Sequence, residues 1–128
     1  MSDAIDLIRR FCDDWGNGAD IDQIVDYFTD DAIYHNIPID PAVVGKDAIK
    51  ATFAMFTTGV ESIEFRILNI AADGSTVLTE RLDIFVFPNV TIELPVMGTF
   101  ELRDGKIAKW RDYFDLNQYM TQMAAAAG

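Results

Sequence analysis

Two opposite charges interrupt a strongly hydrophobic segment of the sequence, TERLDIFVF, at Thr79–Phe87. Its Leu, Ile, Phe and Val residues are typical of a buried β-strand. Arg81 and Asp83 stand two positions apart, and alternate residues of a strand point to the same face. Because an unpaired buried charge is very costly, this segment constrains the fold. If the strand is interior, its charged side chains need partners inside the protein.

Two β-hairpins are predicted in the second half of the chain. The first joins residues 61–72 to 76–87 through the turn sequence DGS, and the second joins 90–103 to 106–115 through DG. Short turns that contain glycine, placed between hydrophobic runs, favour hairpins. The second half is therefore expected to form a meander of long strands.

Helical periodicity predominates in the first half of the chain. Ser2 and Asp20 are suited to cap the first two helices. The last helix is followed by AAAAG, which we expect to fray. The patterns predict helices over residues 3–16, 21–28, 45–57 and 116–123, with a short strand over Ala32–Ile37.

The order of these elements predicts an α+β fold. Helices come first and strands afterwards, so the helices are expected to pack on one face of a curved antiparallel or mixed sheet. We find no repeat or linker, and 128 residues suffice for a single core. We therefore expect one domain over residues 1–128.

Composition excludes several classes of function. The formal charge of −11 argues against nucleic acid and anionic membranes as partners. No apolar run approaches the roughly 20 residues of a membrane helix. One cysteine and no export signal predict a cytoplasmic protein without an internal disulfide. Without a His/Cys cluster or a calcium-loop pattern, no metal is expected.

A further carboxylate falls on a hydrophobic strand face, in the segment KIAKWRDYFD. If residues 106–115 form a strand, Asp112 shares the more apolar of its two faces. That face holds Ala108, Trp110, Asp112 and Phe114, and the opposite face holds Ile107, Lys109, Arg111 and Tyr113.

The segment YHNIP contributes a third polar group. Tyr34 and Asn36 share a strand face, and His35 points the other way. Tyr34 and Asn36 can hold a water molecule or simply close a turn before Pro38. We expect His35 to be exposed or satisfied, and Cys12, on a helical stripe, to belong to the core.

Two interior carboxylates require a cation between them, and Arg81 is the obvious candidate. Its planar guanidinium can bind two carboxylates at once. Two carboxylates held so close cannot both ionise easily, so one is expected to keep its proton near neutral pH. The alternative is a solvent-facing ion pair between Arg81 and Asp83, with Asp112 bonded to a backbone N–H group or paired with a lysine.

The segments YHNIP, ERLD and WRDYFD resemble the signature segments of limonene-1,2-epoxide hydrolases in order and approximate spacing. The resemblance implies a cone-shaped α+β fold, in which a curved mixed sheet is wrapped by N-terminal helices around a deep apolar pocket. It also implies a homodimer and a reaction that needs no metal or cofactor.

The same resemblance implies a role for each polar residue. Asp112 corresponds to the general base that activates water, and Tyr34 and Asn36 to the residues that help to hold it. Asp83 corresponds to the general acid that protonates the epoxide oxygen, and Arg81 to the arginine that bridges both aspartates.

The expected function is hydrolysis of a hydrophobic epoxide, terpene-like or cycloaliphatic, to a vicinal diol. Bulkier lipid or steroid epoxides stay open as substrates. Phe85, Phe114 and Val96 are expected to line the pocket, although a core position would give the same pattern. The alternatives are an enzyme like ketosteroid isomerases or polyketide cyclases, or a non-catalytic module that binds apolar ligands, because one fold hosts many functions.

Overall fold

The computed structural model describes residues 3–127 and contains one six-stranded sheet. The strand order is β2-β1-β6-β5-β4-β3, and every neighbouring pair is antiparallel except β1 and β6, which are parallel. The predicted mixed sheet and α+β class are thus confirmed. The strands are β1 (Phe28–Asn36), β2 (Val43–Val44), β3 (Ser62–Asp73), β4 (Thr76–Phe87), β5 (Val90–Arg103) and β6 (Lys106–Tyr113).

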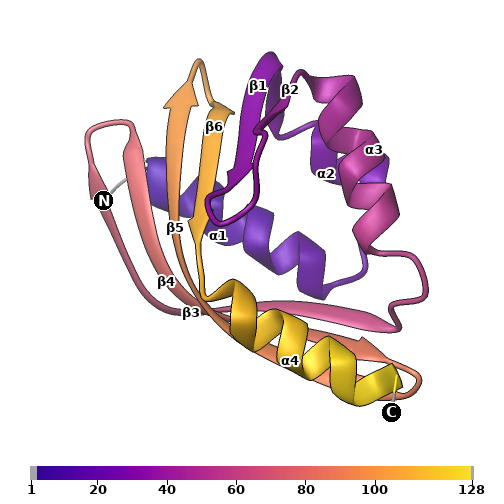
Figure 1. Cartoon of the computed structure of the whole chain (residues 1–128). Coiled ribbons are helices and arrows are strands. Elements are labelled where there is room, and N and C mark those ends of the chain that lie inside the picture. The colour runs from indigo at the N-terminus through magenta and orange to yellow at the C-terminus, as the bar shows by residue number, and fades with distance from the viewer. Residues whose placement is uncertain (1–2, 128) are drawn as a thin grey trace.

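The sheet curves around the first three helices of the chain (Figure 1). The helices are α1 (Asp3–Gly16), α2 (Ile21–Val25), α3 (Lys46–Phe56) and α4 (Leu116–Ala127). Helix α1 packs against β3, α3 packs against β1, and the C-terminal α4 packs against β5. No helix among residues 3–127 combines the length and apolar character that crossing a bilayer requires.

An aromatic core lies between the sheet and the first three helices. Phe11 of α1 is fully buried and packs edge-on against Trp110 of β6, with ring centres 5.2 Å apart. Trp15 meets Phe53 of α3 and Phe65 of β3, with both pairs of ring centres 5.2 Å apart. Burial of such large side chains is the main stabilising contribution. This core supports one wall of the pocket described below.

Three predicted boundaries differ from the structure by more than two residues. The second helix ends at Val25, and Phe28 instead begins β1, where it is 1% exposed and pairs with Ile107. Strand β1 therefore starts earlier than predicted. Helix α4 continues through the alanines to Ala127, because alanine has the highest helix propensity. The predicted cap Ser2 and the final Gly128 lie outside the described residues.

The predicted placement of Ile107 on the face opposite Trp110 and Asp112 is wrong. Ile107 is fully buried, because β6 carries a bulge. Glu101 pairs with Lys109 and the next residue of β5 pairs with Ile107, so Ala108 is an extra residue. A bulge interrupts the alternation of strand faces, and Ile107 consequently joins the core. Beyond the bulge Trp110 and Asp112 are both buried, as the alternation predicted.

Candidate active site

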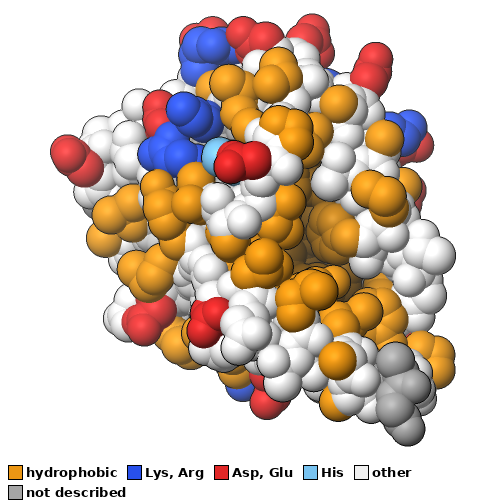
Figure 2. Space-filling view, in the orientation of Figure 1, with side chains coloured by type: hydrophobic (Ala, Val, Ile, Leu, Met, Phe, Trp, Pro, Cys, Tyr) orange, Lys and Arg blue, Asp and Glu red, His pale blue; other side chains and the backbone are white. Residues whose placement is uncertain are grey.

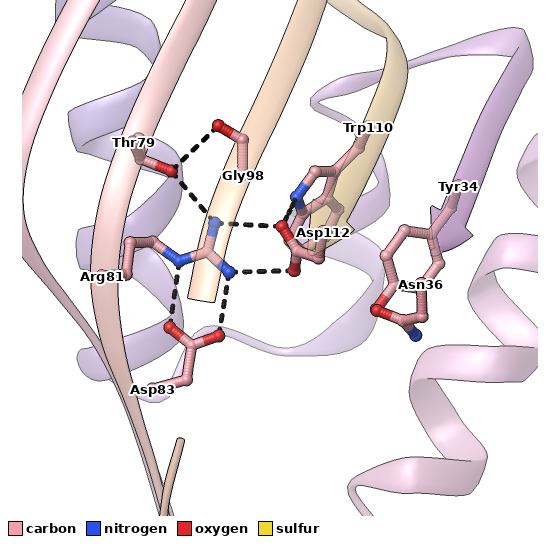
Figure 3. Close-up of polar contacts among 8 residues, drawn as sticks. All are labelled: Tyr34, Asn36, Thr79, Arg81, Asp83, Gly98, Trp110 and Asp112. Atoms are coloured by element: carbon pink, nitrogen blue, oxygen red, sulfur yellow. Dashed lines mark hydrogen bonds and ion pairs between the residues drawn. The ribbon is translucent and has the colours of Figure 1, made fainter. Parts of the chain in front are cut away.

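Arg81 binds two buried carboxylates at once (Figure 3). Its Nε and Nη2 donate to Asp83 Oδ1 and Oδ2 at 2.9 and 2.8 Å. Its Nη1 and Nη2 donate to Asp112 Oδ1 and Oδ2 at 3.2 and 2.9 Å. All three residues are at most 5% exposed. The alternative of a solvent-facing Arg81–Asp83 pair is therefore wrong. We call Arg81, Asp83 and Asp112 the charged triad.

The two aspartates reach Arg81 from strands that are not neighbours. Arg81 and Asp83 lie on β4 and Asp112 lies on β6, with β5 between them. At the crossing point β5 supplies Gly98, which pairs with Thr79 on one side and Asp112 on the other. A Cβ atom at Gly98 would lie 2.4 Å from Arg81 Nη1 and 2.7 Å from Asp112 Oδ1. The triad can close only because this position has no side chain.

Two further residues fix the orientation of the charged triad. Thr79 Oγ1 accepts a hydrogen bond from Arg81 Nη1 at 3.2 Å and donates to the carbonyl of Gly98 at 3.4 Å. Trp110 Nε1 donates to Asp112 Oδ1 at 2.6 Å. Asp112 Oδ1 thus accepts two hydrogen bonds and Oδ2 accepts one, which leaves Oδ2 a free lone pair.

Sequence reasoning did not assign roles to Thr79, Gly98 and Trp110. Thr79 lies on the same strand face as Arg81, and Trp110 on the same face as Asp112. The alternation of strand faces could therefore have indicated that both lie near the charged residues. A glycine inside a strand often marks a close approach of other groups, which was the available signal for Gly98.

Burial and charge shift the protonation of the triad in a defined direction. Burial raises the pKa of Asp83 above its ordinary value, and the nearby Asp112 charge adds to the rise against the opposing effect of Arg81. Burial alone would lower the pKa of Arg81, but the charges of both aspartates raise it well above the ordinary value. The guanidinium is therefore a permanent cation. It also lies over the ring of Phe65, 5.1 Å from the ring centre.

Tyr34 and Asn36 stand next to Asp112 across the parallel pair of strands (Figure 3). The register places Asn36 beside Asp112 and Tyr34 beside Trp110. Tyr34 Oη donates to Asn36 Oδ1 at 3.2 Å. Burial, with the Asp112 charge, raises the pKa of Tyr34, so this phenol stays protonated. The hydrogen bond fixes the Asn36 amide with its NH₂ group free to donate.

A mainly apolar pocket of about 190 Å³ opens beside these groups. Figure 2 shows a hollow edged by hydrophobic side chains. The lining contains Asp83, Asp112, Tyr34 and Asn36, while Arg81 is only 1% exposed. Phe85, Phe114 and Val96 all line the pocket, and the lining residues that sequence reasoning missed are Ile39, Thr52, Met55, Phe56, Phe65, Phe87, Leu94 and Tyr119.

The remaining candidate groups lie outside this constellation. His35 Nε2 is 3.1 Å from the carbonyl of Ile39 and 3.2 Å from Asp40 Oδ1, both in the loop after β1. Cys12 is buried in the core, as predicted. Among residues 3–127, no group of three or more His, Cys, Asp and Glu side chains is placed to hold a metal ion.

Comparison with known families decides where this chain belongs. The sequence model of the limonene-1,2-epoxide hydrolase catalytic domain matches residues 2–125. The chain belongs to the limonene-1,2-epoxide hydrolase family. Epoxide hydrolase EphG of Mycobacterium tuberculosis (strain ATCC 25618 / H37Rv) is 36% identical over 97 residues, which are 76% of this chain and 64% of that protein. The match thus spans less than two thirds of the relative.

Solved structures agree with this family and its fold. The structure of an M. tuberculosis limonene-1,2-epoxide-hydrolase-like epoxide hydrolase superposes with a TM-score of 0.82 at 30% identity, covering 98% of this chain and 92% of that one. A SnoaL-like polyketide cyclase from Shewanella putrefaciens CN-32 gives a TM-score of 0.86, with 98% of each chain covered, but only 17% identity. The cyclase likeness shows the cone-shaped fold alone.

Replacement of Arg81 by alanine should destabilise the protein strongly. Arg81→Ala leaves two buried carboxylates without their cation, and breaking a buried pair typically costs about 3–5 kcal/mol. Asp83→Asn should cost less, because Arg81 keeps Asp112. Thermal denaturation with circular dichroism measures both.

Arg66→Ala is the matched control. Arg66 pairs with Glu64, two residues away on β3, but both side chains are about half exposed. Its loss should leave the melting temperature almost unchanged. An Arg81→Ala protein that melts like this control would contradict an interior charged triad.

Proposed function

We propose that this protein hydrolyses a hydrophobic epoxide to a vicinal diol by one-step attack of water, with no metal or organic cofactor. The observation that carries the proposal is one arginine bridging two buried aspartates that both line an apolar pocket. Membership of the limonene-1,2-epoxide hydrolase family supports it.

Asp112 is the proposed general base and acts through Oδ2. Oδ1 already accepts hydrogen bonds from Trp110 and Arg81, whereas Oδ2 keeps one lone pair for a water proton. Asn36 and Tyr34 border the same space and hold this water against Asp112. Positioning the nucleophile in this way lowers the barrier by removing its freedom to move.

Asp83 is the proposed general acid. Its raised pKa favours a carboxyl that still carries a proton, as protonation of the epoxide oxygen requires. Water oxygen bonds to one epoxide carbon as that carbon releases the ring oxygen. The water proton moves to Asp112, and the Asp83 proton moves to the ring oxygen. After the diol leaves, solvent returns the proton from Asp112 to Asp83.

The size and lining of the pocket favour a compact cyclic substrate. An apolar cavity of about 150 Å³ can hold benzene. The pocket here is about 190 Å³, and Phe85, Phe114 and Val96 contribute to its walls. A cycloaliphatic or terpene-like epoxide matches this space better than a steroid or long-chain lipid epoxide.

The isomerase or cyclase alternative fits the site less well. Proton abstraction from a carbonyl substrate calls for a carboxylate base facing an oxyanion site. Here four of the five N–H groups of Arg81 donate to the two aspartates and the fifth donates to Thr79. None is left to bind an oxyanion.

The homodimer implied by the family remains a proposal, as does the cytoplasmic location. Met97 and Tyr113 pair across β5 and β6 and are 53% and 47% exposed. They point away from the pocket, because their neighbours Val96 and Asp112 point into it. Large exposed side chains of this kind on the outer face of the sheet support a contact between two copies.

Asp112→Asn should keep the fold and abolish hydrolysis. The amide has the size of the carboxylate and can still accept from Trp110, but it cannot take a proton from water. We expect diol formation from cyclohexene oxide, followed by gas chromatography, to fall by at least about 100-fold. Activity within tenfold of wild type in a folded variant would remove the base role from Asp112.

The rate should fall as pH rises through the pKa of Asp83. Because burial raises this pKa, the acid form persists above the usual range of a carboxyl, and each further rise in pH removes more of it. The measurement is kcat/KM for cyclohexene oxide from mildly acidic to alkaline pH, corrected for spontaneous hydrolysis. A rate that keeps rising with pH until the protein unfolds would argue against an acid role for Asp83.

A single-turnover experiment in heavy-oxygen water separates direct attack from a covalent ester. With enzyme in excess over cyclohexene oxide, direct attack by the water bound at Asp112 places the heavy oxygen in the diol from the first turnover. An ester route would yield unlabelled first-turnover diol and label in an enzyme carboxylate. Mass spectrometry of diol and protein reads both, and unlabelled diol would make Asp83 and Asp112 candidate nucleophiles.

A further inference from the structure

Among residues 3–127, strand β5 has one edge whose first half no strand covers. It pairs with β4 from Val90 to Glu101, but β6 pairs with it only from Met97 onward. The opposite edge of the first half of β5 is therefore left without a strand. Such an edge presents unpaired N–H and C=O groups and needs a partner of some other kind.

The side chain of Gln122, on helix α4, supplies that partner. Glu93 N donates to Gln122 Oε1 at 2.8 Å, and Gln122 Nε2 donates to the carbonyl of Glu93 at 2.9 Å. A neighbouring antiparallel strand would exchange the same two bonds with Glu93. The pairing admits only one orientation of the amide, because Glu93 offers one donor and one acceptor.

The helix fixed in this way is part of the substrate pocket. Tyr119 lies three residues before Gln122, on the same side of α4, and lines the pocket with Phe114. Leu94, next to Glu93 on β5, lines the pocket as well. Figure 1 shows α4 running along the lower part of the sheet, beyond the end of β6. The Gln122–Glu93 pair thus joins two walls of one cavity.

Helix α4 depends on such docking for its position. It has only 12 residues, and an isolated helix of that length is marginal in water. Its Met120 is 57% exposed, so part of its apolar surface contributes little to packing. A two-point hydrogen bond is directional and fixes both the distance and the rotation of the helix relative to β5.

We propose that Gln122 is a positioning residue, which holds α4 against β5 so that Tyr119 forms a wall of the substrate pocket. The effect on substrate affinity rests on the epoxide hydrolase function proposed above. Because Gln122 bonds to Glu93 and not to the charged triad, its loss should weaken binding of substrate and transition state alike. That raises KM and leaves kcat nearly unchanged.

Gln122→Met tests this inference, with Gln118→Met as the matched control. Methionine keeps the length and helix propensity of glutamine but cannot form the two hydrogen bonds. Gln118 lies one turn earlier on α4 and is exposed. Hydrogen exchange of the α4 amides reports helix docking, and KM and kcat for cyclohexene oxide and limonene 1,2-epoxide report the pocket.

In Gln122→Met alone, we expect faster exchange across α4, a rise in KM of about fivefold for both epoxides, and kcat within about twofold of wild type. Unchanged exchange, or faster exchange with unchanged KM, would overturn the inference. If wild type hydrolyses neither epoxide, the proposed function fails. Faster exchange in Gln122→Met alone would even then support the docking role, and unchanged exchange would exclude it.

Discussion

The structure depends on one buried cation that serves two carboxylates. Arg81 is buried and has lost its hydration. Its four hydrogen bonds to Asp83 and Asp112 offset the lost hydration free energy. The desolvation cost of buried charges is offset only when the hydrogen-bond geometry is good and every donor is used, so small displacements of these side chains are destabilising. The strands β4, β5 and β6 must therefore hold a fixed register, and the aromatic core that supports them sets the position of the chemistry.

The charged triad also keeps its net charge constant during the proposed reaction. A protonated Asp83, a cationic Arg81 and an ionised Asp112 sum to zero. After the water proton has moved to Asp112 and the Asp83 proton to the substrate, the sum is still zero. Because all three side chains are buried, the site then avoids the large cost of an uncompensated charge at any stage. Two aspartates around one arginine achieve this balance, which one aspartate could not.

Sequence patterns predicted those residues of the site that the alternation of strand faces reveals. The sequence of a single strand is enough to show a polar residue on an otherwise apolar face. Arg81, Asp83 and Asp112 were recognised for this reason. The contribution of Gly98 depends on what crosses β5 from two sides, and that requires the register of three strands. Ile107 was misplaced for a related reason, because a bulge leaves no trace in the local pattern. The pocket wall from α4 depends on helix docking, which periodicity does not describe.

Because Gly98 has no side chain, the charged triad can form only when the strands pair in the native register. The neighbours of Gly98 on β5 are Met97 and Thr99, so a slip of one residue in the pairing would bring a side chain into the space where Arg81 meets Asp112. The misaligned sheet would then hold three ionisable side chains that cannot reach one another inside a hydrophobic core. Such a state is penalised far more than a slip between apolar faces alone. The same residues that carry the chemistry thereby help the chain to discriminate its native pairing from close competitors.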